Sequence, residues 1–459
     1  MIWPVALAVL TAAAYGILST LQWRTLQAPS WDLGIFTQLA RDYGELRAPI
    51  VPIKGDDVNL LGDHFHPILV LLAPVWWIWP SGLALLWTQA LLLGGSAIPL
   101  TRIAMDKLGP LRGGLAGAAY ALSFGLQGAQ EAQFHEIAFA VPLLALSLSA
   151  LLRGRIAATC LWAAPLVLVK EDLGLTVLLL GAVIAWRYQR YRLEGVGLAC
   201  WGAGWFLLST FLILPWLNPE GRHDYTGRLG SVLDVFVPGQ KWVTVILLLC
   251  VAGAIGARSP LITLMLPTLA WRFLGTVEFY WGWTWHYNAV LMPIALAALI
   301  DAVVRDHPWA LDRGESREPR THRHRAGACR WITPAVLTSC AATLVLTPQL
   351  PLASLAEPAS WRATWRAEPA QAAMRAAPDG TVVASDITLM AYLVPDHDVQ
   401  WIHGPNQRVP DCVVVDDYAF SWTEGAPQDA AQWAQQTWST EFREVYSEGG
   451  FQVACRPAG

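Results

Sequence analysis

Long apolar stretches, separated by short polar segments, run along most of the chain. A helix needs about 20 apolar residues to cross a bilayer core of about 30 Å. Stretches of roughly that length, or somewhat shorter, occupy residues 2–22, 81–102, 112–129, 136–152, 156–170, 173–186, 195–217, 241–257, 259–274, 286–304 and 331–349. The pattern predicts a polytopic α-helical membrane protein with about eleven transmembrane helices.

The composition agrees with this prediction and narrows the class of protein. Hydrophobic residues make up 54% of the 459 residues and charged residues 14%. A typical soluble domain carries about 25% charged residues. A soluble globular enzyme, a disordered chain, a collagen and a small disulfide scaffold are therefore excluded.

The basic residues predict how the chain is oriented, because cytoplasmic loops carry an excess of Lys and Arg. These residues gather in loops at 102–112, 153–155, 187–192 and 305–330. All four loops are cytoplasmic if the N-terminus is cytoplasmic. This orientation makes 23–80 an outer loop, 305–330 a cytoplasmic linker, and the residues after the last span extracytoplasmic.

Residues 350–459 differ in character from the transmembrane domain expected at 1–349. They hold 14 acidic and 6 basic residues in mixed patterning. Local patterns predict two buried strands and two helices, at Thr381–Ser385, Cys412–Asp416, Ala370–Ala377 and Asp429–Thr437. The sequence thus predicts a C-terminal extracytoplasmic α/β domain.

Two cysteines of this domain, Cys412 and Cys455, are candidates for a disulfide. Such bonds persist in oxidising compartments outside the cytoplasm. The alternative is a pair of buried thiols on neighbouring strands.

The first outer loop contains a short amphipathic segment that begins near Asp32. Leu33, Phe36, Leu39 and Ala40 recur at helical spacing, so we expect a helix lying on the membrane surface. Asp32 either caps this helix or points into an outer cavity as a general base or metal ligand.

Asp63, His64 and His66 lie where the same loop meets an apolar piece, Ile68–Trp79, that is too short to span. Carboxylate and imidazole groups bind divalent metals, and protonated imidazole can hold phosphate. With Asp32, the two histidines are candidates for a metal site. The alternative is ordinary hydrogen bonding by histidines at the membrane interface.

Two further charged groups occur at predicted outer ends of spans. Glu131, His135 and Glu136 precede one span, where the positive end of a helix also favours acids. Lys170–Asp172 lies within continuous apolar sequence, where ionised side chains are costly and functional by default. The alternative there is an internally neutralised Lys–Glu pair.

The turn Phe279–Tyr287 combines six large aromatic residues with His286. Aromatic faces stack on sugars, and they also form interfacial belts. Arg222, in the outer loop 218–240, is a candidate phosphate contact. Under the predicted topology, all of these clusters open on the same outer side.

Several of these segments together resemble a known family. WDLGIFTQ, HFHPILVLLAP, QFHEIAFAVPLLALSLSALLRGR, VLVKEDLGLTVLLL and HYNAVLMP, followed by the tail segment VVASDITLMAYLVP…DCVVVDD, resemble the bacterial membrane-protein family named domain of unknown function 2079. That family is similar to the GT-C glycosyltransferases. Those enzymes use polyprenyl-phosphate sugars as donors and work on the outer face of the membrane.

The resemblance implies a multi-pass protein of the bacterial plasma membrane with a GT-C-like fold. It further implies transfer of a sugar from a polyprenyl-phosphate donor to an envelope glycan, glycolipid or protein. The bilayer is an expected partner, nucleic acid is not, and a divalent metal cation is a candidate cofactor. The alternative is a non-enzymatic transporter, or a scaffold whose outer domain binds a partner.

The resemblance also implies a role for each candidate residue. Asp32 matches the acidic residue of the first outer loop, which acts as catalytic base, and Glu136 lies near a second acidic position. Lys170 matches a lysine that contacts the lipid phosphate, and Arg222 is expected to assist it. The expected cavity lining is His64, His66, His135, Glu171, Asp172, His286 and Tyr287.

Overall fold

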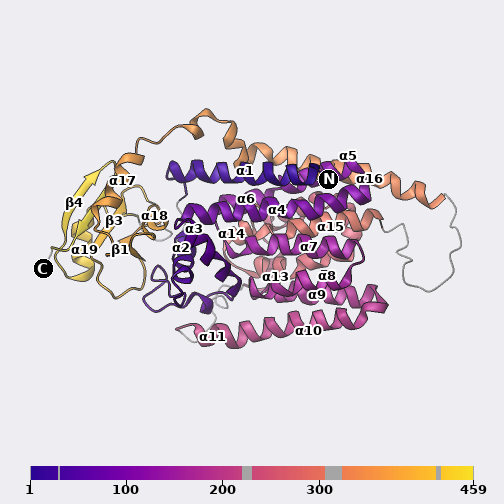
Figure 1. Cartoon of the computed structure of the whole chain (residues 1–459), viewed down its shortest axis with the longest axis horizontal. Coiled ribbons are helices and arrows are strands. Elements are labelled where there is room, and N and C mark those ends of the chain that lie inside the picture. Colours follow the sequence, from indigo (N-terminus) through magenta and orange to yellow (C-terminus); the bar gives the residue numbers. More distant parts are fainter. Residues whose placement is uncertain (1, 29–30, 220–229, 305–322, 420–424, 458–459) are drawn as a thin grey trace.

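The computed structural model describes residues 2–28, 31–219, 230–304, 323–419 and 425–457. Long helices run roughly along the longest axis of the molecule, and a small sheet domain lies at one end of the bundle (Figure 1). We call this end the domain end and the opposite one the far end. Helix α1 (Ile2–Arg24) starts at the far end and reaches the domain end.

The bundle helices coincide with the expected spans, several of which are interrupted by short 3-10 turns. They are α4 (Gly82–Leu108), α5 (Pro110–Ala121), α6 (Phe124–Glu131), α7 (Ala140–Leu152), α8 (Ile156–Ala163), α9 (Leu173–Arg187), α10 (Arg192–Leu208), α11 (Leu214–Leu217), α12 (Gln240–Val251), α13 (Leu266–Leu274), α14 (Glu278–Trp281), α15 (Leu291–Val304) and α16 (Arg323–Leu346).

Helix length and the hydropathy pattern give different numbers of membrane crossings. In the described part of the chain, 4 helices are long and apolar enough to cross a membrane, or up to 5 with one bent pair. The remaining apolar helices are of 10–17 residues. Every expected span contains a helix, and the count of about eleven stays a prediction.

Close helix packing in the bundle depends on small residues. A Cβ atom on Gly181 of α9 would lie 2.4 Å from the backbone nitrogen of Ala199 on α10. A Cβ atom on Gly195 of α10 would lie 2.4 Å from the backbone nitrogen of Ala185. Small side chains let backbones approach, which is typical of helix pairs in membranes.

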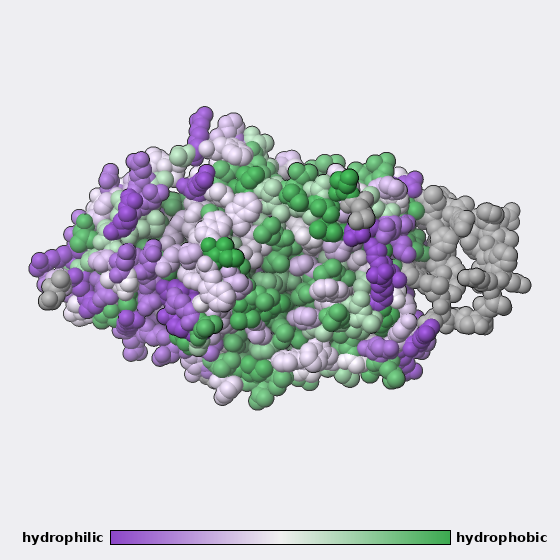
Figure 2. All heavy atoms as spheres, viewed as in Figure 1, coloured by the Kyte–Doolittle hydropathy of each residue, from purple (hydrophilic) through white to green (hydrophobic). Residues whose placement is uncertain are grey.

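The surface of the bundle is apolar in its middle and polar at the domain end (Figure 2). Large apolar side chains are exposed along it, among them Val9, Leu10, Leu91, Phe211 and Leu344. An apolar belt of this extent is suited to lipid rather than to water. The structure is therefore that of a helical membrane protein.

The C-terminal domain is a five-stranded sheet with the strand order β2-β1-β3-β5-β4. Its first three strands pair in parallel and the last two pair antiparallel. The elements are α17 (Ala367–Ala376), β1 (Val382–Ser385), α18 (Met390–Leu393), β2 (Asp398–Trp401), β3 (Cys412–Asp416), α19 (Ala430–Trp438), β4 (Arg443–Glu448) and β5 (Phe451–Cys455). The predicted strands and helices are all present, which confirms the α/β class.

A disulfide joins Cys412 and Cys455 in this sheet. The two residues are register partners on the neighbouring strands β3 and β5. Of the two alternatives left open by the sequence, the structure therefore has the disulfide.

Helix α2 (Trp31–Gly44) lies between the bundle and the C-terminal domain (Figure 1). Residues Leu33–Asp42 are buried, so this helix is covered on more than one side. The expected helix thus exists, but it does not simply rest on the membrane surface. The apolar piece that follows forms a 3-10 turn and the short helix α3 (Ala73–Ile78).

Two polar side chains of α2 hold the C-terminal domain. The Arg41 guanidinium donates to the carbonyls of Val394 and His397 at 2.9 and 2.6 Å and pairs with Asp398 at 2.7 Å. The Gln38 amide donates to a carbonyl of β2 at 2.6 Å. Because α2 begins with the candidate base, this contact also positions the candidate site.

Candidate active site

Charged and aromatic side chains from five separate segments meet at the domain end of the bundle. The segments are the first turn of α2, the loop before residue 67, the loop between α6 and α7, the turn before α9, and the turn before α15. Each lies at the end of an apolar helix, because charged residues are costly farther inside a membrane. The structure therefore brings together groups that are more than 250 residues apart.

Asp32 lies in the first turn of α2, directly after its first residue. Its side chain is 42% exposed, and its Oδ2 atom lies 3.6 Å from Nε2 of His135. A carboxylate that is accessible and next to an imidazole can accept a proton from a bound hydroxyl. This geometry favours the reading of Asp32 as a base that faces an open site.

His135 is held in place from several sides. Its backbone N–H donates to the buried Gln89 side chain of α4, and its Nδ1 lies 3.1 Å from the carbonyl of Gln133. Its ring stacks on His286 with centroids 3.6 Å apart. Burial lowers the pKa of His135, but Asp32, together with Glu136 and the Gln133 carbonyl, outweighs this effect, so the pKa lies above its usual value.

Glu136 and Lys170 form an ion pair, with Oε1 and Nζ 2.8 Å apart. The side chains are 3% and 12% exposed. The sequence left open an internally neutralised Lys–Glu pair within 170–172. Lys170 is indeed paired, but with an acid that begins the 3-10 turn before α7 and not with its own neighbour.

Glu171 instead binds the loop that precedes residue 67. Its carboxylate lies 2.8 Å from His64 Nδ1 and accepts the backbone N–H of Phe65 at 3.0 Å. Burial lowers the pKa of His64, but the Glu171 and Asp63 carboxylates outweigh it, so the pKa is raised overall. His64 is therefore a close polar partner of Glu171, and their contact connects this loop to the turn before α9.

The neighbouring Asp63 pairs with a lysine that sequence reasoning did not select. Lys54 Nζ lies 2.7 Å from Asp63 and 5.3 Å from the ring centre of Trp31. Lys54 is one of only four lysines in the chain, and that rarity was the available signal. It connects the loop to the start of α2, next to Asp32.

Arg272 of α13 is a second cation that the sequence reading missed. Its side chain is fully buried and donates to the Tyr280 and Gly282 carbonyls and to the Asn288 side chain. The guanidinium also lies 5.6 Å from the ring centre of Tyr287. A lone Arg within an apolar span was the signal that could have found it.

Two predicted cavity residues each have a buried polar atom that forms no hydrogen bond within the described part of the chain. Nδ1 of His66 and Oδ1 of Asp172 have no hydrogen-bond partner among the described residues. The other oxygen of Asp172 accepts the indole N–H of Trp271 at 2.9 Å. His66 is packed beside the ring of Phe36, at 6.0 Å between centroids.

The structure does not bring Asp32, His64 and His66 together as a metal site. Asp32 faces His135 and His64 faces Glu171. Within the described ranges, no group of three or more His, Cys, Asp or Glu side chains could hold a metal ion. The expected contact from Arg222 lies outside the described residues.

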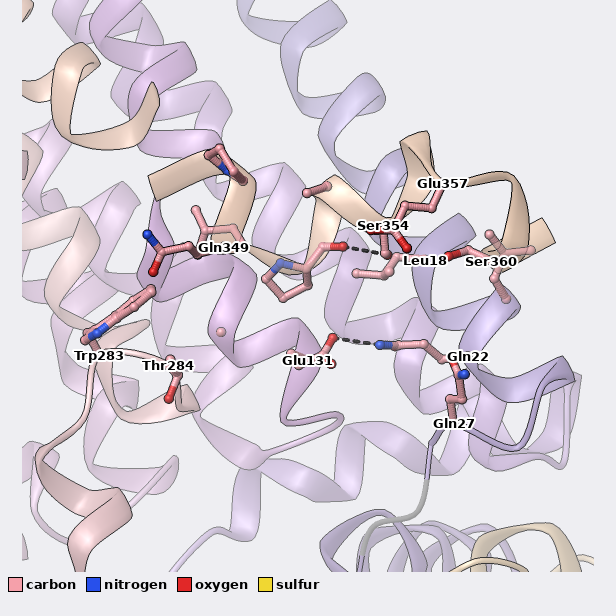
Figure 3. Close-up of a pocket in the computed structure, with 16 residues that line it drawn as sticks. Leu18, Gln22, Gln27, Glu131, Trp283, Thr284, Gln349, Ser354, Glu357 and Ser360 are labelled. Carbon is pink, nitrogen blue, oxygen red and sulfur yellow. Dashed lines mark hydrogen bonds between the residues drawn. The ribbon is translucent and has the colours of Figure 1, made fainter. Parts of the chain in front are cut away.

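Two cavities lie beside this cluster, at the domain end. One, of about 370 Å³, is lined by α1, α6, the turn at 283–284 and residues 348–360 (Figure 3). The other, of about 440 Å³, lies between the loop at 54–63 and residues 405–407 of the C-terminal domain. The sequence placed Glu131 with the charged cluster, whereas the structure places it in the wall of the first cavity.

Two solved structures have a similar fold over almost their whole length. The crystal structure of ArnT from Cupriavidus metallidurans bound to undecaprenyl phosphate gives a TM-score of 0.56 at 12% identity, covering 99% of this chain and 98% of that one. The same protein in the apo state gives 0.51 at 14% identity, covering 98% and 97%. These likenesses confirm the GT-C-like fold.

Comparison by sequence gives a family but no characterised relative. No curated protein matches the chain. The family model described as "Predicted membrane protein (DUF2079)" matches residues 22–457, which confirms the resemblance carried by the motifs. The chain belongs to the DUF2079 family of predicted membrane proteins.

Proposed function

We propose that this protein is a membrane glycosyltransferase that moves a sugar from a polyprenyl-phosphate donor to an acceptor of the cell envelope. The domain end of the bundle then faces the outside of the plasma membrane, with the N-terminus in the cytoplasm. The observation that carries the proposal is the accessible carboxylate of Asp32, beside His135, in a charged cluster at the end of an apolar bundle. The ArnT-like fold supports it, since that protein was solved with undecaprenyl phosphate.

In this proposal Asp32 is the catalytic base. It takes the proton from an acceptor hydroxyl while the hydroxyl oxygen forms a bond to the anomeric carbon of the donor sugar. The bond from that carbon to the phosphate oxygen breaks, and its electron pair leaves with the lipid phosphate. A single displacement of this kind inverts the anomeric configuration.

Lys170 is the proposed contact to the donor phosphate. An ammonium group has three N–H donors, and within the described part of the chain only Glu136 accepts one from Lys170. Two donors remain for phosphate oxygens, while the ion pair with Glu136 keeps the side chain oriented. Arg222 is proposed as a second contact to the donor phosphate. Glu136 is paired with Lys170, so its role is to orient this lysine more than to bind the acceptor.

The test compares envelope glycans and glycolipids by mass spectrometry in strains that carry the wild type, a deletion, Asp32→Asn or Lys170→Ala. Asp106→Asn and Lys107→Ala, at the far end of α4, serve as matched controls. We expect one sugar-bearing species to vanish in the deletion and in both site variants and to persist in the controls. Because Lys170→Ala leaves the buried Glu136 carboxylate unpaired, the double variant Lys170→Ala with Glu136→Gln should lose the same species at normal protein level. If both site variants keep that species, the cluster is not catalytic and the scaffold alternative replaces this proposal.

A further inference from the structure

The side chains that line the cavity of about 370 Å³ at the domain end differ in character from the charged cluster beside it (Figure 3). It has the volume of a small-molecule site. None of its lining residues in the described chain is Lys, Arg or His. Its polar side chains are amides, hydroxyls and two carboxylates, beside the indole ring of Trp283.

The charges of the lining side chains determine which ligands the cavity can bind. The carboxylates of Glu131 and Glu357 disfavour phosphates and acidic sugars, because no cation in the described wall offsets them. Gln22 donates its amide N–H to Glu131 at 2.6 Å, and its own amide oxygen has no hydrogen-bond partner among the described residues. The exposed Glu131 carboxylate can accept further hydrogen bonds, and a polyhydroxylated molecule supplies several donors.

The cavity and the charged cluster share a wall. Glu131 ends α6 four residues before His135, across a non-helical turn, and Thr284 lies two residues before His286. The two segments touch closely, since a Cβ atom on Gly128 would lie 2.5 Å from the Thr284 carbonyl oxygen. The stacked rings of His135 and His286 continue the same contact toward Asp32.

We propose that this cavity is a subsite for a neutral, polyhydroxylated part of the acceptor. Trp283 provides the apolar face on which a sugar ring stacks, and Gln22 and Glu131 accept hydrogen bonds from its hydroxyls. The position beside the shared wall lets the acceptor extend from the cavity toward Asp32. This inference rests on the proposed function, which it deepens by naming the acceptor class.

The binding test uses the full chain in nanodiscs. The probe is the pool of oligosaccharides released from the envelope of the deletion strain, separated by ion exchange into neutral, anionic and cationic fractions. We expect saturable binding of the neutral fraction, weakened about tenfold by Trp283→Ala and by the isosteric Glu131→Gln. Trp365→Ala, at a tryptophan that is 70% exposed outside the cavity, should bind like the wild type.

Preference for the anionic or cationic fraction overturns the inference, as does wild-type affinity in a folded Glu131→Gln variant. Asp32→Asn separates the two proposals, because it should retain binding while losing sugar transfer. Neutral glycan binding without any transfer by the wild type overturns the proposed function and supports the subsite. Transfer that is unaffected by both cavity variants overturns the subsite alone.

Discussion

The Lys170 ammonium and the Glu136 carboxylate form an ion pair at 2.8 Å, although one lies before α9 and the other before α7. Both side chains are almost entirely shielded from water. A buried pair of this kind adds little net stability relative to apolar side chains, yet breaking it strands a charge. Each residue therefore needs the other to keep its buried charge paired, whatever ligand Lys170 binds.

We therefore predict that Glu136→Ala destabilises the protein by about 3–5 kcal/mol, because the Lys170 ammonium is left without its counter-charge. The double variant Glu136→Ala with Lys170→Met should recover much of the loss. Thermal unfolding in nanodiscs measures both. Asp106→Ala, which breaks the more exposed pair with Arg153, should cost at most about 1 kcal/mol; an equal loss there would contradict the argument.

The contact of Arg41 with the C-terminal domain predicts a coupled effect on stability and activity. Arg41→Ala leaves two carbonyls and the Asp398 carboxylate without their donor, which should cost about 3 kcal/mol. Hydrogen exchange should then increase in residues 390–400, and activity should fall because α2 carries Asp32.

The control for this prediction is Arg47→Ala. Arg47 is half exposed, and its ion pairs within the described ranges are with Asp42 and Glu45 of its own segment. It should leave exchange in residues 390–400 unchanged. If Arg41→Ala and Arg47→Ala behave alike, the domain is not held through Arg41.

The disulfide closes a long loop, since its cysteines are 43 residues apart in sequence. Because the disulfide limits the conformations of the unfolded chain, we expect it to stabilise the folded domain by about 4 kcal/mol. The double variant Cys412→Ser with Cys455→Ser should lower the unfolding temperature of the C-terminal domain, and added reductant should lower it no further. A reductant effect that persists in this variant would show that another bond is responsible.

Asp386 predicts a pH dependence of the C-terminal domain. Burial raises the pKa of this carboxyl to about 7, whereas its usual value is about 3.9. Between these values the folded domain holds one more proton than the unfolded chain. Its stability should therefore fall as the pH rises, by about 1.4 kcal/mol per pH unit, and should level off above pH 7.

Asp386→Asn tests this prediction through the slope of stability against pH. The backbone N–H groups of Thr388 and Asp416 donate to different oxygens of the Asp386 carboxyl group. The amide keeps an acceptor for only one of them, which costs a constant amount that does not depend on pH. Thermal unfolding between pH 5 and 8 should be flatter in the variant than in the wild type. Parallel curves would remove Asp386 as the titrating group.

The sequence alone predicted features that depend on local pattern. Hydropathy located the helices of the bundle, because each span must be apolar over its own length. Short continuous apolar runs located β1 and β3, which are buried on both faces. The same local reasoning did not locate β2, β4 or β5. The side chains of β4 are mostly exposed and give no burial signal, and β2 and β5 are short.

Tertiary structure alone decided which charged groups meet. Nothing near Lys170 in sequence indicates Glu136 as its partner over Glu171, and nothing near Asp32 indicates His135. Those pairings depend on how the helices are ordered around one another and on how the C-terminal domain covers α2. Hydropathy determines that a charge lies at a helix end, but only packing between distant segments determines which other charge is within 3 or 4 Å of it.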